Sequence, residues 1–377
     1  MNITQALPLL GGLSPAAFMK RHWHKKPLLI RQAIPGFQPL LERRALFDLA
    51  AQDDVESRLI AMTQQRGREV WRLRQGPFER RALPPLKQAA WTLLVQGVDL
   101  HDDRVHALMN QFRFIPDGRL DDLMISFATE GGGVGPHYDS YDVFLLQAQG
   151  RRRWRIARRY DPALREDVPV KILANFEAEQ EFVLEPGDML YLPHRYAHDG
   201  VSLDAECMTY SIGFRSPARG ELAQDLLQRL AEEVVEEIGE ERYRDPAQPA
   251  VDHPAAIPEA LQAFAEQGVR DALKNPLTLQ RALGENLTEP KPQVWFEPGS
   301  AAGAGSAIAL DRRTRMMYDA KHLYINGESY RAGGRDATLM RRLADHRRLE
   351  VAELSRASAA ARELLDAWCE AGWAHAG

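Results

Sequence analysis

The feature that most constrains the fold is a series of short apolar segments between residues 123 and 214, separated by glycine and proline. Short segments rich in β-branched and aromatic residues, ended by turn residues, are typical of strands. Many such strands in succession indicate a sandwich or a barrel. The expected strands are Ile125–Ala128, Val143–Ala148, Arg153–Ala157, Phe182–Leu184, Met189–Leu192 and Met208–Phe214.

The region after this series changes to helical periodicity. Ser216-Pro217 opens a helix in which apolar residues recur from Leu222 to Ile238, opposite an acidic face. That apolar stripe must be buried, either within the monomer or against a second copy across a two-fold axis. A proline-rich stretch, residues 246–258, leads to a further helix near residues 260–273.

The last hundred residues have the pattern of a winged helix. After Pro276 we expect a helix, a hairpin that turns at Asn326-Gly327, and two helices near residues 338–343 and 357–368. We therefore predict three domains: a strand-rich domain over 1–215, a helical region over 216–274 and a winged-helix-like domain over 275–377.

Composition excludes several classes of protein. A chain of 377 residues with 45% hydrophobic and 27% charged residues is long enough for two or three folded domains. No segment approaches the roughly 18 apolar residues that a membrane helix needs, and no targeting segment is recognisable at the start, so we expect a cytoplasmic protein with no membrane partner. The two cysteines, Cys207 and Cys369, are too few for a disulfide framework or a thiolate zinc site.

A histidine and a carboxylate stand two residues apart at His137 and Asp139, after a glycine-rich segment. In extended backbone, residues i and i+2 point to the same side, so both can reach one ion. A third ligand is available from His194 or His198, which follow the expected strand Met189–Leu192. Two histidines and one carboxylate form the facial triad of iron(II) oxygenases, although a lone His-x-Asp pair is more often a hydrogen-bonded pair in a turn.

Three motifs together resemble the JmjC-type 2-oxoglutarate oxygenases. They are residues 131–142, Gly150 to Trp154, and Gly187-Asp188 through Pro193 to His198. The resemblance extends over nearly the whole chain and is specifically to bacterial ribosomal oxygenases that hydroxylate an arginine of large-subunit ribosomal protein sixteen.

The resemblance implies an α+β fold: a double-stranded β-helix of the cupin or jelly-roll type, a helical dimerisation region and a C-terminal winged helix. It further implies Fe(II), 2-oxoglutarate as co-substrate, O2, a ribosomal protein substrate and a homodimer. The spacing of the family's motif implies that His198, rather than His194, is the third metal ligand. His194 then becomes a neighbouring or surface residue.

A dicarboxylate co-substrate needs a cation, and arginine matches a carboxylate with two parallel hydrogen bonds. Of the four arginines in residues 151–155, only Arg152 shares a strand face with Trp154 and Ile156. An arginine on an apolar face is costly without an anion, so Arg152 is the candidate. The resemblance points to the same residue, and to Ser126 as a hydroxyl partner.

Three further residues are candidates for substrate binding. Asp122 and Met124 share strand parity with Ser126, and Tyr141 shares parity with His137 and Asp139. An arginine substrate needs a carboxylate and apolar walls, so we hypothesise that Asp122 pairs with it and that Met124 and Tyr141 flank it. The alternative is that Asp122 caps a turn and the other two are core residues.

Three other functions stay open from sequence. One is hydroxylation of a different protein residue, such as histidine, by the same ligands. Another is a cupin-type metal enzyme that acts on a small molecule, although such an enzyme has no need of a buried Arg152. The third is a metal-sensing regulator whose winged helix binds DNA. Because basic residues exceed acidic ones by only eleven to seven between Asp311 and Arg356 in a chain of net charge −5, we expect no direct DNA binding.

Overall fold

The structure, a computed structural model, describes residues 2–303 and 305–377. It divides into two compact units, one ending at Ser216 and the other beginning at Pro217. The expected three-part division, with a further boundary at residue 274, stays a prediction. Among the described helices, none is both long enough and apolar enough to cross a membrane.

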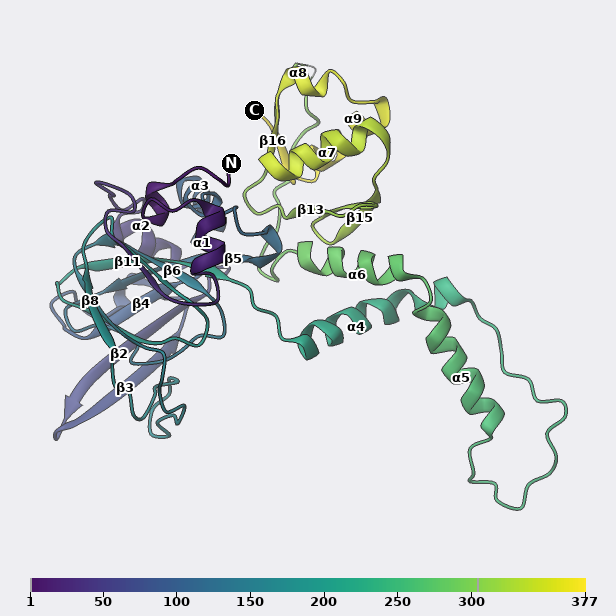
Figure 1. The fold of residues 1–377 in the computed structure, drawn as a ribbon, viewed down its shortest axis with the longest axis horizontal. Helices are drawn as coiled ribbons and strands as arrows, with labels where there is room; N and C mark the ends of the chain where they lie inside the picture. The colour runs from purple at the N-terminus through teal and green to yellow at the C-terminus, as the bar shows by residue number, and fades with distance from the viewer. Residues whose placement is uncertain (1, 304) are drawn as a thin grey trace. The chain divides into compact units, whose positions relative to one another are not determined.

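The first unit is built on two antiparallel sheets (Figure 1). In spatial order the larger sheet contains β1 (Leu28–Ile30), β9 (Met189–Leu192), β6 (Val143–Gln149), β11 (Cys207–Phe214), β5 (Leu120–Ala128), β4 (Trp91–Val95), β2 (Ser57–Gln65) and β3 (Arg68–Gln75). The smaller sheet contains β10 (Ala197–Ser202), β7 (Arg152–Ala157) and β8 (Gln180–Leu184).

Short helices complete this unit. They are α1 (Pro15–Arg21), α2 (Arg43–Leu49) and α3 (Asp103–Asn110), with 3₁₀ turns η1 (Pro8–Leu10), η2 (Arg80–Ala82), η3 (Val98–Leu100) and η4 (Asp117–Arg119). Helix α1 begins with a capped turn: Ser14 accepts a hydrogen bond from the backbone N–H of Ala17, and Pro15 occupies the first turn. Each helix buries apolar residues, Phe18, Leu46 and Leu108 among them, in the main core.

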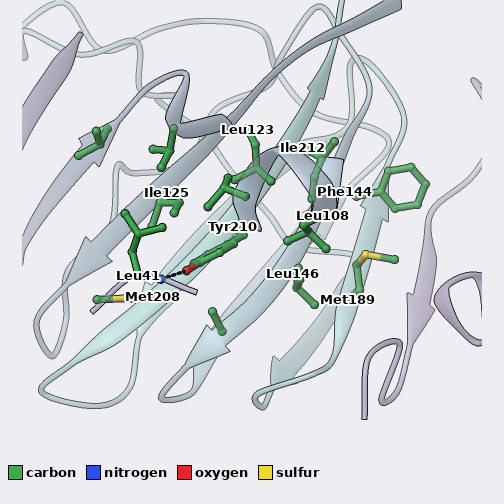
Figure 2. Packing of buried hydrophobic residues seen from close by; sticks show 14 of the residues in the cluster. Leu41, Leu108, Leu123, Ile125, Phe144, Leu146, Met189, Met208, Tyr210 and Ile212 are labelled. Atoms are coloured by element: carbon green, nitrogen blue, oxygen red, sulfur yellow. Dashed lines mark hydrogen bonds between the residues drawn. The ribbon is translucent and has the colours of Figure 1, made fainter. Parts of the chain in front are cut away.

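Alternation along the strands divides the large sheet into a core face and a cavity face, with register shifts near both ends of β11. On β5 the side chains of Leu123 and Ile125 join the main core, and on β11 Tyr210 and Ile212 do the same (Figure 2). The residues between them face the opposite side of the sheet. Tyr210 also fixes the segment that precedes α2, because its hydroxyl accepts a hydrogen bond from the backbone N–H of Leu41 at 3.2 Å.

The second unit begins with helices α4 (Arg219–Ile238), α5 (Glu259–Ala272) and α6 (Pro276–Thr288). Its core has two small sheets, β16-β12-β17 and β13-β14-β15, covered by helices. The strands are β12 (Ile308–Leu310), β13 (Met316–Tyr318), β14 (His322–Ile325), β15 (Glu328–Arg331), β16 (Arg348–Leu349) and β17 (Ala374–Ala376); the helices are α7 (Gly334–His346), α8 (Val351–Leu354) and α9 (Ala359–Glu370). The Asn326-Gly327 turn joins β14 to β15, as expected.

The apolar stripe of α4 is largely exposed in the single chain. Leu230 is its one fully buried member in the described helix, whereas Leu227, Val235 and Ile238 are 57%, 60% and 41% exposed. Burial of the whole stripe within the monomer is therefore wrong. Packing against a second copy stays open.

Candidate functional site

A cavity of about 600 Å³ lies between the two sheets of the first unit. Its walls come from the cavity face of β5, β6 and β11, from β7 and β10 of the smaller sheet, and from the segment that precedes β6. All eight residues predicted from sequence to form the site line it: Asp122, Met124, Ser126, His137, Asp139, Tyr141, Arg152 and His198.

Backbone pairing brings His137 and His198 together. They form an isolated antiparallel bridge in which each residue's N–H donates to the other's carbonyl, at 2.9 and 2.7 Å. Their rings lie on the same side, with centroids 4.2 Å apart. The extended backbone that the sequence requires at His137 is thus supplied by one bridge rather than by a regular strand.

Both histidines are oriented by the backbone. The Nδ1 atom of His137 lies 2.9 Å from the Gly135 carbonyl, and that of His198 lies 2.9 Å from the Tyr196 carbonyl. A carbonyl only accepts, so each Nδ1 carries the proton and each Nε2 is left as a free electron-pair donor. Burial, and then the neighbouring His137, lower the pKa of His198 to about 4, so its ring is neutral at pH 7.

Asp139 completes a set of three ligand-type side chains. Its Oδ2 is 3.6 Å from Nε2 of His198, and the candidate ligand atoms of His137, Asp139 and His198 all lie within 4.8 Å of one another. Two imidazoles with unprotonated Nε2 atoms and one carboxylate suit a divalent transition metal ion. The donor set therefore fits the iron that the sequence motif predicts.

The glycine-rich segment before His137 is explained by close packing. A Cβ atom on Gly133 would lie 2.5 Å from the carbonyl oxygen of Gly200 on β10. Gly135 has φ 79°, and a Cβ there would be 2.7 Å from Ile172. Only glycine lets this segment lie flat against β10, which positions His137 opposite His198.

Arg152 is a buried cation with unused hydrogen-bond donors. The residue is 4% exposed, its Nε and Nη2 atoms make no hydrogen bond, and its guanidinium lies 5.7 Å from the centre of the Trp154 ring. Leaving a buried charge without an anion is costly. A carboxylate bound in the cavity would satisfy it, and Ser126, also buried there, adds a hydroxyl.

The neighbouring arginines have other roles. Arg151 pairs with Asp204 at 2.9 Å, and Arg155 pairs with Asp199, its register partner on β10, at 2.5 Å. Arg153 points away from the cavity with them. The alternation expected from sequence therefore separates Arg152 from the other three.

The three candidate substrate residues lie around the same cavity. Oδ2 of Asp122 accepts a hydrogen bond from the backbone N–H of Gly97 at 3.0 Å, so this side chain supports a turn as well as lining the cavity. Desolvation, and then the carboxylates of Asp139 and Asp122, raise the pKa of Tyr141, which keeps its hydroxyl protonated. Met124 lies on β5 between Asp122 and Ser126.

Sequence reasoning missed several cavity residues. Arg58 on β2 adds a cation, and Pro169, Val170 and Lys171 come from the long connection between β7 and β8. Tyr138 also lines the cavity, and its ring packs against that of Tyr160 in a tilted arrangement with centroids 5.1 Å apart. A long connection without periodicity gives no signal of where it packs. The apolar run 59–62 of β2 likewise shows no alternation that would assign Arg58 to the cavity face.

Comparisons with known proteins agree with the geometry. A JmjC domain matches residues 107–222, and a ROXA-like winged helix matches residues 271–375. The chain is 34% identical over 329 residues to the Escherichia coli ribosomal protein uL16 3-hydroxylase, covering 82% of this chain and 84% of that protein. These matches confirm the expected JmjC-type barrel and winged helix.

Solved structures show the same likeness over nearly the full length. An X-ray structure of E. coli YcfD matches with a TM-score of 0.80 and 30% identity, covering 95% of this chain and 96% of that one. A structure of YcfD, described as a ribosomal oxygenase in complex with cobalt and 2-oxoglutarate, matches with a TM-score of 0.78 and 29% identity, covering 96% and 98%.

Proposed function

Because this chain belongs to the family of JmjC-type ribosomal oxygenases, we propose that it is an Fe(II)- and 2-oxoglutarate-dependent oxygenase that hydroxylates an arginine of large-subunit ribosomal protein uL16. The expected ribosomal protein sixteen is the substrate named for the E. coli relative. Such a substrate fits a cytoplasmic enzyme.

The single observation that carries the proposal is Arg152. A buried guanidinium with two nitrogens unpaired, in the same cavity as His137, Asp139 and His198, requires an anion beside the metal site. 2-Oxoglutarate has one carboxylate for the metal and another for this arginine. A cupin-type enzyme acting on a small neutral molecule would leave Arg152 unpaired.

We assign the metal to His137, Asp139 and His198, and the far carboxylate of 2-oxoglutarate to Arg152 and Ser126. Bound iron and 2-oxoglutarate supply the oxidising power that places one oxygen atom of O2 on a C–H carbon. The protein orients both imidazoles through the Gly135 and Tyr196 carbonyls, so that each Nε2 is available to the metal.

Substrate arginine would enter beside Asp122. A carboxylate has about four acceptor sites, so Asp122 can hold the Gly97 N–H and still accept from a guanidinium. The protonated Tyr141 hydroxyl and the flexible Met124 would flank the substrate's methylene stem. Asp121 also lines the cavity and increases its negative charge.

A decisive experiment compares peptides. Incubation with Fe(II), 2-oxoglutarate and a uL16 peptide should add about 16 Da, one oxygen atom, to arginine, with release of succinate. The matched control replaces that arginine with lysine. Modification of a histidine instead, or succinate release that no ribosomal peptide stimulates, would contradict the proposed substrate.

We also propose that the exposed stripe of α4 forms a two-fold dimer contact. Leu227, Val235 and Ile238 are open to solvent in the single chain, and a closed symmetric contact would bury the same residues of both copies. This contact would give the helical region predicted over 216–274 its role in dimerisation.

A further inference from the structure

A second group of ligand-type side chains lies outside the cavity. The candidate ligand atoms of His24, Asp142 and His194 all lie within 4.8 Å of one another. Asp142 immediately precedes β6 and shares parity with the core residue Phe144, so it points away from the cavity. None of the three belongs to the described lining of the cavity.

The imidazole nitrogens and the carboxylate oxygen of these three side chains are spaced like ligand atoms around one metal ion. Nδ1 of His24 is 2.8 Å from Nδ1 of His194 and 3.2 Å from Oδ2 of Asp142. Nδ1 of His194 is 4.0 Å from the same carboxylate oxygen. Zinc bonds of 2.0–2.1 Å in a tetrahedron separate ligand atoms by about 3.3 Å, the middle of this range.

Asp142 gives an independent reason to expect a cation. Its side chain is fully buried, and its Oδ1 accepts a hydrogen bond from the Tyr191 hydroxyl at 2.6 Å. Its Oδ2 is buried and makes no hydrogen bond, although His24 lies within ion-pair distance. A buried carboxylate oxygen without a partner is costly, and it is aimed at the two imidazoles.

The two imidazole nitrogens need something between them. At 2.8 Å, two lone pairs repel, so the pair must share either a proton or a metal ion. Desolvation is the largest of the effects that lower the pKa of His24, which favours a neutral ring with a lone pair to donate.

One neighbour opposes a cation. Nη2 of Arg119 lies 3.4 Å from Nε2 of His24, and the guanidinium also donates to the carbonyl of Arg215 at 2.5 Å. Without metal, Nε2 of His24 can accept from Arg119 while its Nδ1 shares a proton with His194. The negative charge of Asp142 balances the positive charge of Arg119, so the two side chains together do not repel a divalent ion.

We propose that His24, Asp142 and His194 bind a divalent transition metal ion of the Zn(II) class at a site separate from the oxygenase cavity. Two imidazoles and one carboxylate are the ligands of open zinc sites, and they leave a position for water. The side chains of His24 and His194 are 31% and 36% exposed, so an ion has a route from solvent.

The metal would join segments 170 residues apart in sequence. His24 follows α1, and His194 lies in the turn between β9 and β10. The next residue, Arg195, donates its backbone N–H to the carbonyl of Asp139 at 2.8 Å. A bound ion would therefore fix the turn that supports one of the proposed iron ligands.

The test measures Zn(II) stoichiometry on the intact chain by calorimetry and metal analysis. We expect two equivalents for the wild type and one each for His194→Ala, His24→Asn and His198→Ala. Asparagine tolerates the left-handed backbone of His24, φ 55°, so folding is preserved. The double variant His194→Ala with His198→Ala should bind none. In Co(II)-loaded protein, 2-oxoglutarate should change the visible spectrum of His194→Ala but not that of His198→Ala.

The matched control is His375→Ala. His375 forms a His–Asp pair with Asp311 at 2.8 Å that lacks a second imidazole, so its loss should leave two equivalents bound. A single equivalent in the wild type, or two equivalents retained by both His24→Asn and His194→Ala, would overturn the proposal. Because succinate release depends on the cavity alone, that result would leave the oxygenase assignment standing.

Discussion

At the scale of single residues, two buried charged groups keep polar atoms that make no hydrogen bond. Arg152 keeps two buried nitrogens without hydrogen bonds in the cavity, and Asp142 keeps one buried oxygen without a hydrogen bond on the other side of the sheet. Folding such groups is unfavourable unless something binds them. Each therefore indicates a ligand of opposite charge.

Replacing Arg152 should weaken co-substrate binding. A hydrogen bond to a charged group contributes about 1.5–3 kcal/mol, so Arg152→Ala should raise KM for 2-oxoglutarate by about 10- to 100-fold with a smaller effect on peptide KM. Steady-state assays of succinate release measure this. The control Arg151→Ala removes an exposed arginine paired with Asp204. Equal effects of the two variants would count against the assignment of Arg152.

The two roles of Asp122 can be separated by two substitutions. Asp122→Asn keeps an oxygen that accepts from the Gly97 N–H but removes the charge, whereas Asp122→Ala removes both. We expect both variants to lose peptide hydroxylation and to keep peptide-independent 2-oxoglutarate turnover, with a lowered melting temperature only for alanine. Full peptide turnover by Asp122→Asn would show that its carboxylate only supports the turn.

At the scale of elements, the glycine-rich segment and β10 hold the metal ligands in register. Gly133→Ala places a Cβ 2.5 Å from a backbone carbonyl that cannot move independently of the bridge between His137 and His198. We expect a lower melting temperature and at least about tenfold weaker Co(II) binding, measured by calorimetry. Gly220→Ala is the control, because a Cβ there meets nothing within 4 Å. Unaltered Co(II) affinity in Gly133→Ala would argue against this role.

Between residues 120 and 214, sequence patterns predicted the six apolar strands and missed the polar one. Five of the six occur within two residues of the expected ends, whereas β5 begins five residues earlier, at Leu120 rather than Ile125. Strand β10 was missed because it contains His198, Asp199 and Gly200, which have low strand propensity. His198 lines the cavity, and Asp199 is buried on the opposite face in its pair with Arg155, so tertiary contacts overrode local propensity.

Strand parity predicted which nearby residues share the cavity face, whereas the family resemblance was needed to join His198 to His137. Parity placed Arg152 apart from Arg153 and grouped Asp122 with Ser126, and the structure agrees. The pairing of His24 with His194 joins residues 170 positions apart, which no periodicity could indicate. The same holds for Lys171, which reaches the cavity from a long connection.

At the scale of the whole molecule, the exposed helix α4 predicts assembly. The double variant Leu227→Glu with Val235→Glu should convert a dimer into a monomer, because acidic side chains would face each other across the two-fold axis. Sedimentation velocity at micromolar concentration measures this. Leu261→Glu, on α5, is the control for added surface charge. If the wild-type chain sediments as a monomer under the same conditions, the proposed dimer is wrong.

The interleaving of core and cavity positions along β5 and β11 has a consequence for how such an enzyme diversifies. Exchanging Met124 or Ser211 reshapes the pocket without touching the packing of Leu123 or Ile212. Inserting one residue into either strand, by contrast, would reverse its alternation. Leucine side chains would then face the cavity, and serine side chains would face the hydrophobic core. New specificities should therefore arise in these strands by point replacement, while changes of length are confined to the connecting loops.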